Sequence, residues 1–250
     1  MTAMWMALLA AFAPTAQAGA GTSHGTAEVL NEGEWEVGVY APLRRGMGNG
    51  VELSIHPLVA LLSPHLALKK TWSTDGAWAI ASRHSLMYPT PLLRTIAREG
   101  TGGIIVADAE IPPTLASDHR FIATTGVGEA TELSLSARVM VGAGLGEGDW
   151  PSIDMPLSYT RTAAYRDHVA SAAGVQLDGG LVGPLFYRLD VDGWWLPNSD
   201  AAWATEVKTT VHWRPSDGFN AHIGATAVVG EYPYGNNWHL LPAFDLIWRW

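Results

Sequence analysis

The chain ends with FDLIWRW, residues 244–250, in which large apolar side chains alternate with polar ones. Successive side chains of an extended strand point to opposite faces, so Asp245 and Arg249 share one face. The alternation reaches back to Trp238, where another aromatic residue begins the apolar face. The apolar face of the last segment carries Phe244, Leu246, Trp248 and Trp250. This pattern predicts a β-strand with one apolar side that has tryptophan at both ends.

A second segment, residues 203–213 (WATEVKTTVHW), repeats the pattern with Trp203 and Trp213 at the ends of its apolar face. Ten residues of strand cover about 33 Å, and at a tilt of about 40° they rise about 25 Å. That height matches the apolar band between the aromatic girdles of a β-barrel that spans a membrane. The predicted lipid-facing girdle comprises Trp203, Trp213, Trp238 and Trp248.

Alternating segments recur along the chain and indicate an all-β protein. We predict a closed, antiparallel, up-and-down transmembrane β-barrel of about 12 strands, with about 10 strands as the alternative. A soluble β-sandwich also alternates, but its ring-bearing residues would not gather at the ends of its strands. The segment 24–31 is needed to make the number of strands even. The predicted strands lie near 24–31, 34–43, 48–57, 64–73, 77–88, 115–125, 131–143, 166–179, 184–196, 202–213, 219–230 and 238–250.

The connections of such a barrel alternate between short turns at one end and longer loops at the other. Two long external loops are expected, near 89–114 and 144–165. The short connections are expected to begin at Arg44, Ser73, Gly126, Gly180 and Arg214.

The loop 89–114 contains a predicted helix, with Thr90 as its cap, Pro91 in its first turn and Gly100 at its exit. Its apolar residues would be poorly solvated in water, so we expect the loop to fold into the mouth of the barrel. The candidates for a constriction there are Arg94 and Arg98, which would meet acidic residues of the wall.

The terminal segment resembles the last strand of bacterial outer-membrane β-barrel proteins, a porin-like class whose chains end in an aromatic residue after alternating apolar ones. The resemblance is to the class and to no individual family. It implies the outer membrane of a Gram-negative bacterium as location, with outer-membrane lipid around the barrel. It also implies that the barrel-assembly machinery reads this segment. The predicted assembly signal comprises Phe244, Leu246, Trp248 and Trp250.

Composition supports export and excludes some functions. Residues 1–18 contain an apolar core and the cleavage motif Ala16-Gln17-Ala18, which predict a signal peptide, so the barrel would span 19–250. The chain has 250 residues, a net charge of −9 and no cysteine. The acidic balance disfavours nucleic acid as a partner, and the absence of cysteine excludes disulfides and thiolate catalysis.

Little in the sequence indicates enzymatic chemistry. His84 and Ser85 are adjacent and would therefore point to opposite faces of a strand, and no G-x-S-x-G motif is present. We therefore predict no catalytic residue, although an enzyme is not excluded. Five histidines fall on the expected inner face without a metal-ligand spacing, so no metal and no cofactor is predicted. They are His56, His168, His212, His222 and His239.

The expected lumen is charged, with more acids than bases, which would favour cations in an open pore. The first functional hypothesis is therefore a narrow channel for small solutes. The alternatives are a non-conducting barrel that binds a partner or supports the envelope, and a membrane-embedded lipid hydrolase. The pore-lining candidates are Glu34, Glu36, Glu52, Arg138, Asp178, Arg188, Asp190, Asp192, Glu206, Lys208, Asp245 and Arg249.

Overall fold

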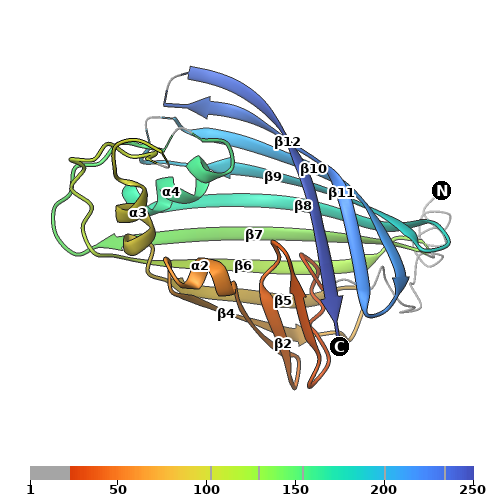
Figure 1. Ribbon diagram of the computed structural model, residues 1–250. Coiled ribbons are helices and arrows are strands. Elements are labelled where there is room, and N and C mark those ends of the chain that lie inside the picture. Colours follow the sequence, from red (N-terminus) through yellow and green to blue (C-terminus); the bar gives the residue numbers. More distant parts are fainter. Residues whose placement is uncertain (1–22, 102, 129, 154, 200, 234) are drawn as a thin grey trace, which may run out of the picture.

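The computed structural model describes residues 23–101, 103–128, 130–153, 155–199, 201–233 and 235–250. Its strands form one closed barrel in which each strand pairs antiparallel with its neighbours in the chain and β1 closes against β12 (Figure 1). The prediction of an all-β, up-and-down barrel of 12 strands is confirmed. The predicted signal peptide lies outside the described residues.

The strands differ greatly in length, because β1–β3 are short and β6–β12 are long. The short strands are β1 (Trp35–Gly38), β2 (Leu43–Gly48) and β3 (Val51–Ile55), and those of middle length are β4 (His65–Ser73) and β5 (Ala79–Met87). The long strands are β6 (Thr114–Gly126), β7 (Thr131–Gly144), β8 (Val169–Val182), β9 (Leu185–Trp195), β10 (Trp203–Ser216), β11 (Phe219–Tyr232) and β12 (Gly235–Arg249).

The expected connection at Arg44 is wrong, because β2 runs through this residue to Gly48. The chain turns instead at Asn49 and Gly50, whose φ angles of 52° and 68° are those that a tight hairpin turn requires. The expected strand 24–31 is also wrong, because these residues form no strand. The barrel still has 12 strands because residues 35–55 contain three strands where the sequence predicts two.

Long loops and short turns lie at opposite ends of the barrel, which we call the loop end and the turn end. The loop end carries connections 88–113 and 145–168, with α3 (Thr90–Ile96) and α4 (Ser158–Arg166), and also α2 (Pro57–Ala60). The last strand finishes at the turn end, where the Trp35 backbone N–H donates to the Trp250 carbonyl at 2.8 Å. Both long loops therefore lie at the same end of the barrel.

The helix α3 occurs where the sequence predicts it, but its ends differ. The Thr90 hydroxyl accepts a hydrogen bond from the Thr114 backbone N–H at 2.7 Å, so it joins the two ends of the loop and does not cap the helix. The helix ends before Ala97, earlier than the predicted exit at Gly100.

The outer face of the barrel is apolar and has aromatic residues at both ends. The four predicted girdle tryptophans are exposed there, and Trp238 is the most exposed, at 72%. At the turn end, Phe219 lies between Trp213 and Trp248, with ring centroids 6.0 and 5.8 Å away. Among the described residues, no helix is long and apolar enough to cross a membrane.

Candidate functional site

The charged residues predicted to line a pore lie on the inner face of the strands, with one partial exception. Glu34 precedes β1 at the turn end, where its carboxylate accepts from the backbone N–H of Asn31 at 3.0 Å. The buried members of the set are Glu36, Glu52, Asp178, Arg188, Glu206 and Asp245. The half-buried members are Arg138, Asp190, Asp192, Lys208 and Arg249.

Many of these charges are paired, as charges away from water must be. Arg44 is the centre of one network, since its guanidinium contacts Glu36 at 2.7 Å and Glu52 at 2.5 Å. Arg249 reaches the second oxygen of Glu36 at 2.9 Å, which joins the last strand to the first. The Arg44 network therefore closes the barrel seam electrostatically.

Sequence reasoning missed three bases on the inner wall, Lys69, Arg83 and Arg120. The strand register places them side by side on β4–β6, in a row that continues to the predicted Arg138 on β7. The alternation of β4, β5 and β6 was the signal that would have shown them. Asp118, also missed, receives two hydrogen bonds from Arg138 at 2.8 and 2.6 Å. With these bases and Arg44 counted, the lumen has no surplus of acid.

Residues 23–31, which we call the N-terminal plug, lie inside the lumen. On one side the Lys69 ammonium donates to the Ser23 carbonyl at 2.7 Å, and the Leu30 N–H donates to Glu52 at 3.1 Å. Further round the wall, the Ala27 N–H donates to the Thr124 hydroxyl of β6 at 2.8 Å, and the Gln176 amide of β8 donates to the His24 carbonyl at 3.1 Å. The plug therefore contacts the inner wall from β3 to β8 and occupies part of the lumen toward the turn end.

Two residues near the start of the plug fit it closely to the wall. Gly25 has a φ of +79°, and a Cβ there would lie 1.9 Å from the Gln176 side chain of β8. The His24 imidazole lies 2.6 Å from Glu36. The pKa of His24 is lowered from 6.5 to about 4, mainly by burial. The positive charges of Arg44 and Arg188 also lower this pKa, whereas Glu36 raises it in part. His24 is therefore neutral in the docked plug at neutral pH.

The helix α4 closes part of the lumen at the loop end. Arg161 donates from Nη2 to Glu206 at 2.9 Å, and the Tyr159 hydroxyl donates to the Ala201 carbonyl at 2.9 Å. The Thr160 hydroxyl also donates to Glu206 at 3.1 Å, and apolar contacts surround the helix. The buried cluster around this helix comprises Met140, Tyr159, Ala163, Ala164, Ala170, Trp194, Leu196, Ala201, Ala204, Val228 and Tyr232.

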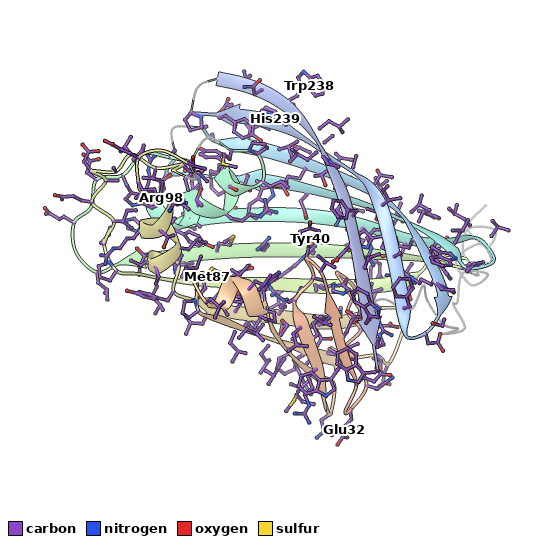
Figure 2. All side chains as sticks on the ribbon, viewed as in Figure 1. Glu32, Tyr40, Met87, Arg98, Trp238 and His239 are labelled. Atoms are coloured by element: carbon purple, nitrogen blue, oxygen red, sulfur yellow. The ribbon has the colours of Figure 1, made fainter. Side chains whose placement is uncertain are left out.

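The predicted constriction residues, Arg94 and Arg98, are not on the acidic wall. Arg94 donates from Nε and Nη2 to the Ile111 carbonyl at 3.0 and 2.7 Å, within its own loop. Arg98 is exposed on the loop end (Figure 2). The loop 89–114 packs its apolar residues against the other long loop, including Trp150, and so needs no place in the lumen. The arginine from a long loop that meets a wall acid is Arg161.

A chamber remains between the N-terminal plug and α4. It consists of two adjoining cavities of about 470 and 330 Å³. His24 of the plug and Leu157, which precedes α4, line both cavities. The wall residues common to both are Arg188, Lys208 and Thr226.

The histidines predicted on the inner face are mostly separated from one another. Two of them, His212 and His222, stand together in the lumen, with ring centroids 4.7 Å apart. The described residues contain no group of three or more His, Asp or Glu side chains that could hold a metal ion. His84 contacts His119 at 2.9 Å, while Ser85, on the opposite face of β5, has a buried hydroxyl without a hydrogen-bond partner.

The fold is similar to several solved outer-membrane proteins. The KdgM porin in complex with disordered oligogalacturonate gives a TM-score of 0.47 at 7% identity, with 87% of this chain and 95% of that chain covered. A bacterial polysaccharide outer membrane secretin gives 0.49 at 8%, covering 88% and 77%. LpxR from Salmonella typhimurium gives 0.41 at 9%, covering 91% and 78%. No protein-family model and no curated protein sequence matches the chain. The likeness is therefore one of fold, a barrel architecture shared with outer-membrane porins and channels.

Proposed function

We propose that the protein is an outer-membrane barrel that acts as a narrow channel for small solutes, which the N-terminal plug keeps closed at rest. Membrane insertion is supported by the apolar outer face and by the separation of Trp203 and Trp213, which suits an apolar band of about 25 Å. In this placement the turn end faces the periplasm. Outer-membrane lipid surrounds the wall, and the barrel-assembly machinery reads the terminal strand.

The observation that carries the channel proposal is the chemistry of the N-terminal plug. Its polar contacts with the wall are hydrogen bonds to charged and hydroxyl side chains, such as Lys69, Glu52 and Thr124, and its apolar contacts include a small cluster of Ala27 with wall residues. Water can replace such contacts at low net cost, since a typical internal hydrogen bond contributes only about 1 kcal/mol. The wall left behind would be charged and hydrated, as the lining of a solute channel must be.

The lumen contains about as many bases as acids, so the surplus of acid that would favour cations is absent from the described residues. The smaller cavity of the chamber is lined by Arg120, Arg188 and Lys208 on the wall and Arg161 on α4, together with three acids, Asp190, Asp192 and Glu206, and the larger cavity adds Asp245. We therefore propose that the open channel discriminates weakly between small cations and anions.

Planar-bilayer recording tests the proposal with two purified chains. A chain that begins at residue 32 lacks the plug and should give stepwise currents, whereas a chain that begins at residue 23 keeps the plug and is the matched control. The reversal potential in a salt gradient should lie near zero for the shorter chain. A shorter chain that is correctly folded, by heat-modifiable mobility, but remains silent would contradict the channel.

A non-conducting barrel is the second candidate, and α4 is the observation that favours it. The apolar cluster around Tyr159 and Trp194 would hold the helix in the mouth even after the plug had left. A second variant of the shorter chain replaces residues 157–166 by a short glycine-serine linker. If the shorter chain is silent and this variant conducts, α4 is what closes the barrel. A lipid hydrolase is disfavoured, because His84 and Ser85 lie on opposite faces of β5.

A further inference from the structure

The wall of the barrel is incomplete beside β12. Strand β1 pairs with Ile247–Arg249 of β12, and backbone hydrogen bonds extend this contact to Trp250, which bonds to Trp35, and to Leu246, whose carbonyl accepts from the Val39 N–H at 3.1 Å. Residues 235–245 of β12 therefore extend beyond the described part of β1, with β11 on one side only. Figure 1 shows the short strands reaching only the lower part of β12, near the C-terminus.

The open edge of β12 lies at the depth proposed for the membrane. It falls between Trp238 and Trp248, the outward tryptophans near the two ends of the strand. An open sheet edge does not occur against hydrocarbon, because its backbone groups would have no partner there; it must be covered by protein or line a hydrated cavity.

Pro242 argues against another strand as the cover. Trp250 exchanges two backbone hydrogen bonds with Trp35, so the even-numbered residues of β12 direct their backbone groups toward this edge. Pro242 is one of them and has no N–H to donate. A proline on an edge strand interrupts any ladder that a second chain would build there.

The larger cavity of the chamber reaches this edge. It is lined by Pro242, Ala243 and Phe244, which are consecutive and so point to opposite faces of β12. A cavity can touch both faces of one strand only by passing around its edge. We call the gap beside the open edge of β12 the opening. Tyr40, labelled in Figure 2, lies on the β1–β2 turn at the margin of the opening, with its ring 5.3 Å from that of Phe244.

The two ends of this cavity differ in chemistry. The outer end is apolar, lined by Tyr40, Pro242 and Phe244. The inner end carries Lys208, which forms no ion pair with any described residue, although Asp190 faces it across the β9–β10 pair. The other charged or titratable residues of the lining are Arg188, which is paired with Asp178, together with His24, His212, His222 and Asp245.

Asp245 does not offset the charge of Lys208 fully, because three backbone N–H groups already bind its carboxylate. They belong to Tyr40, Ala41 and Leu246, at 3.0, 2.8 and 2.8 Å. The same contacts hold the β1–β2 turn against β12 and fix the lower margin of the opening. The inner end of the cavity therefore suits an anion.

We propose that the cavity is a binding site for a single-chain anionic amphiphile, a long-chain carboxylate, which enters from the membrane around the open edge of β12. The alkyl chain lies against Tyr40, Pro242 and Phe244, and the carboxylate reaches Lys208. A cavity of about 470 Å³ is within the ordinary size of small-ligand sites. The site rests on the membrane insertion proposed above but not on conduction.

Binding of radiolabelled dodecanoate to the protein in lipid nanodiscs tests the proposal, with empty nanodiscs subtracted. Dodecanoate should bind saturably, and butanoate at least about 100-fold more weakly, because it lacks most of the buried methylene groups. Dodecyltrimethylammonium, with the same chain and the opposite charge, should not compete. Failure to insert into nanodiscs would refute the membrane placement itself, whereas inserted protein that binds no dodecanoate would refute only the site.

Two pairs of variants locate the site. Lys208→Met should weaken dodecanoate binding at least about tenfold, whereas Lys70→Met, on the outer face, should leave it unchanged. Ala243→Trp should fill the cavity and abolish binding, whereas Ala227→Trp, on the exposed face of β11, should not. Equal effects within either pair would overturn the assignment. A disulfide-linked dimer formed by Leu240→Cys would also overturn it, because a second copy would then cover the edge.

Discussion

Two segments fill the lumen, and they are held by different kinds of contact. The N-terminal plug lies at the turn end and is bound by hydrogen bonds and charged groups, including Lys69 and Glu52. The helix α4 lies at the loop end and buries Tyr159, Ala163 and Ala164 in an apolar cluster. Some polar contacts of α4 with the wall resemble those of the plug, such as the ion pair of Arg161 with Glu206 and the hydrogen bond from the Thr160 hydroxyl to the same carboxylate.

The difference indicates which closure is built to open. Hydrogen bonds between polar groups can be exchanged for hydrogen bonds to water, so release of the plug exposes little apolar surface, mainly that of Leu30 and of the small cluster of Ala27 with Ala81 and Ile122. Release of α4 would expose buried apolar side chains to water, which is unfavourable roughly in proportion to their area. We therefore expect changes in charge and pH to act on the plug, and changes in apolar packing to act on α4.

The largest effect is expected from Arg44→Met. This change leaves the buried carboxylates of Glu36 and Glu52 without their shared cation, and breaking a buried pair costs about 3–5 kcal/mol. Since the chain has no cysteine, Thr26→Cys provides a single buried reporter in the plug. Its labelling by a water-soluble maleimide should accelerate about 100-fold or more in the Arg44→Met background.

The matched control for this prediction is Arg45→Met. Arg45 is the next residue and loses the same charge, but its guanidinium lies over the Trp35 ring at 4.8 Å. Its removal should leave the labelling rate of Thr26→Cys within a few-fold of the parent rate. Equal acceleration by both variants would mean that net charge, and not the Arg44 network, holds the plug.

A smaller effect is expected from Tyr159→Ala on α4. Loss of the buried ring and of its hydrogen bond to Ala201 should weaken docking of the helix by about 3 kcal/mol. Ala164→Cys, fully buried in the parent, reports on this docking through its labelling rate. Thr162→Ala is the control, because the Thr162 hydroxyl bonds within the helix to the Ser158 carbonyl at 2.9 Å.

Each substitution should act on its own closure only. Tyr159→Ala should leave labelling of Thr26→Cys unchanged, and Arg44→Met should leave labelling of Ala164→Cys unchanged. If either variant accelerated both reporters equally, the two closures would form one cooperative unit and the comparison would fail.

The smallest effect is expected from pH. The docked pKa of His24 is about 4 and its ordinary value is 6.5, so docking favours the neutral imidazole. This contribution is fully present above pH 6.5 and is lost progressively as the pH falls toward 4. The charged groups that act on the imidazole are Glu36, Arg44 and Arg188.

Labelling of Thr26→Cys measures the pH effect when each rate is divided by that of the unfolded chain at the same pH. The ratio should rise as the pH falls from 6.5 to 4, and His24→Gln should flatten the rise. A rise that persists in the His24→Gln variant would assign the titration to another group, with Glu36 the first to examine.

Alternation along the chain is a local property, and it was sufficient to predict the barrel. Residues 131–143 and 203–213 each show one apolar and one polar face, and their counterparts β7 and β10 are confirmed. The outward direction of Trp203 and Trp248 follows from the same period of two. The side of the long loops follows from counting strands, because antiparallel neighbours must alternate in direction.

What the sequence could not decide is which segments fill the lumen. A segment whose backbone bonds to wall side chains, as residues 23–31 do, has no period that distinguishes it from a strand. The pairing of Arg161 with Glu206 joins residues far apart in the chain, and the same rule of charge complementarity would have allowed Arg94. Only the packing of the two long loops against each other removes that choice.

The sequence by itself thus determined the wall, because the residues of each strand alternate between an apolar outer face and a polar inner face. The tertiary structure alone decided the contents of the lumen and the opening beside β12. The opening follows from the early β1–β2 turn after Gly38, which the Tyr40 and Ala41 N–H groups fasten to Asp245 and which leaves β1 short, together with the full length of β12. The mismatch in length between β1 and β12 exists only where these two strands pair across the chain. The local sequence pattern of either strand alone therefore does not show it.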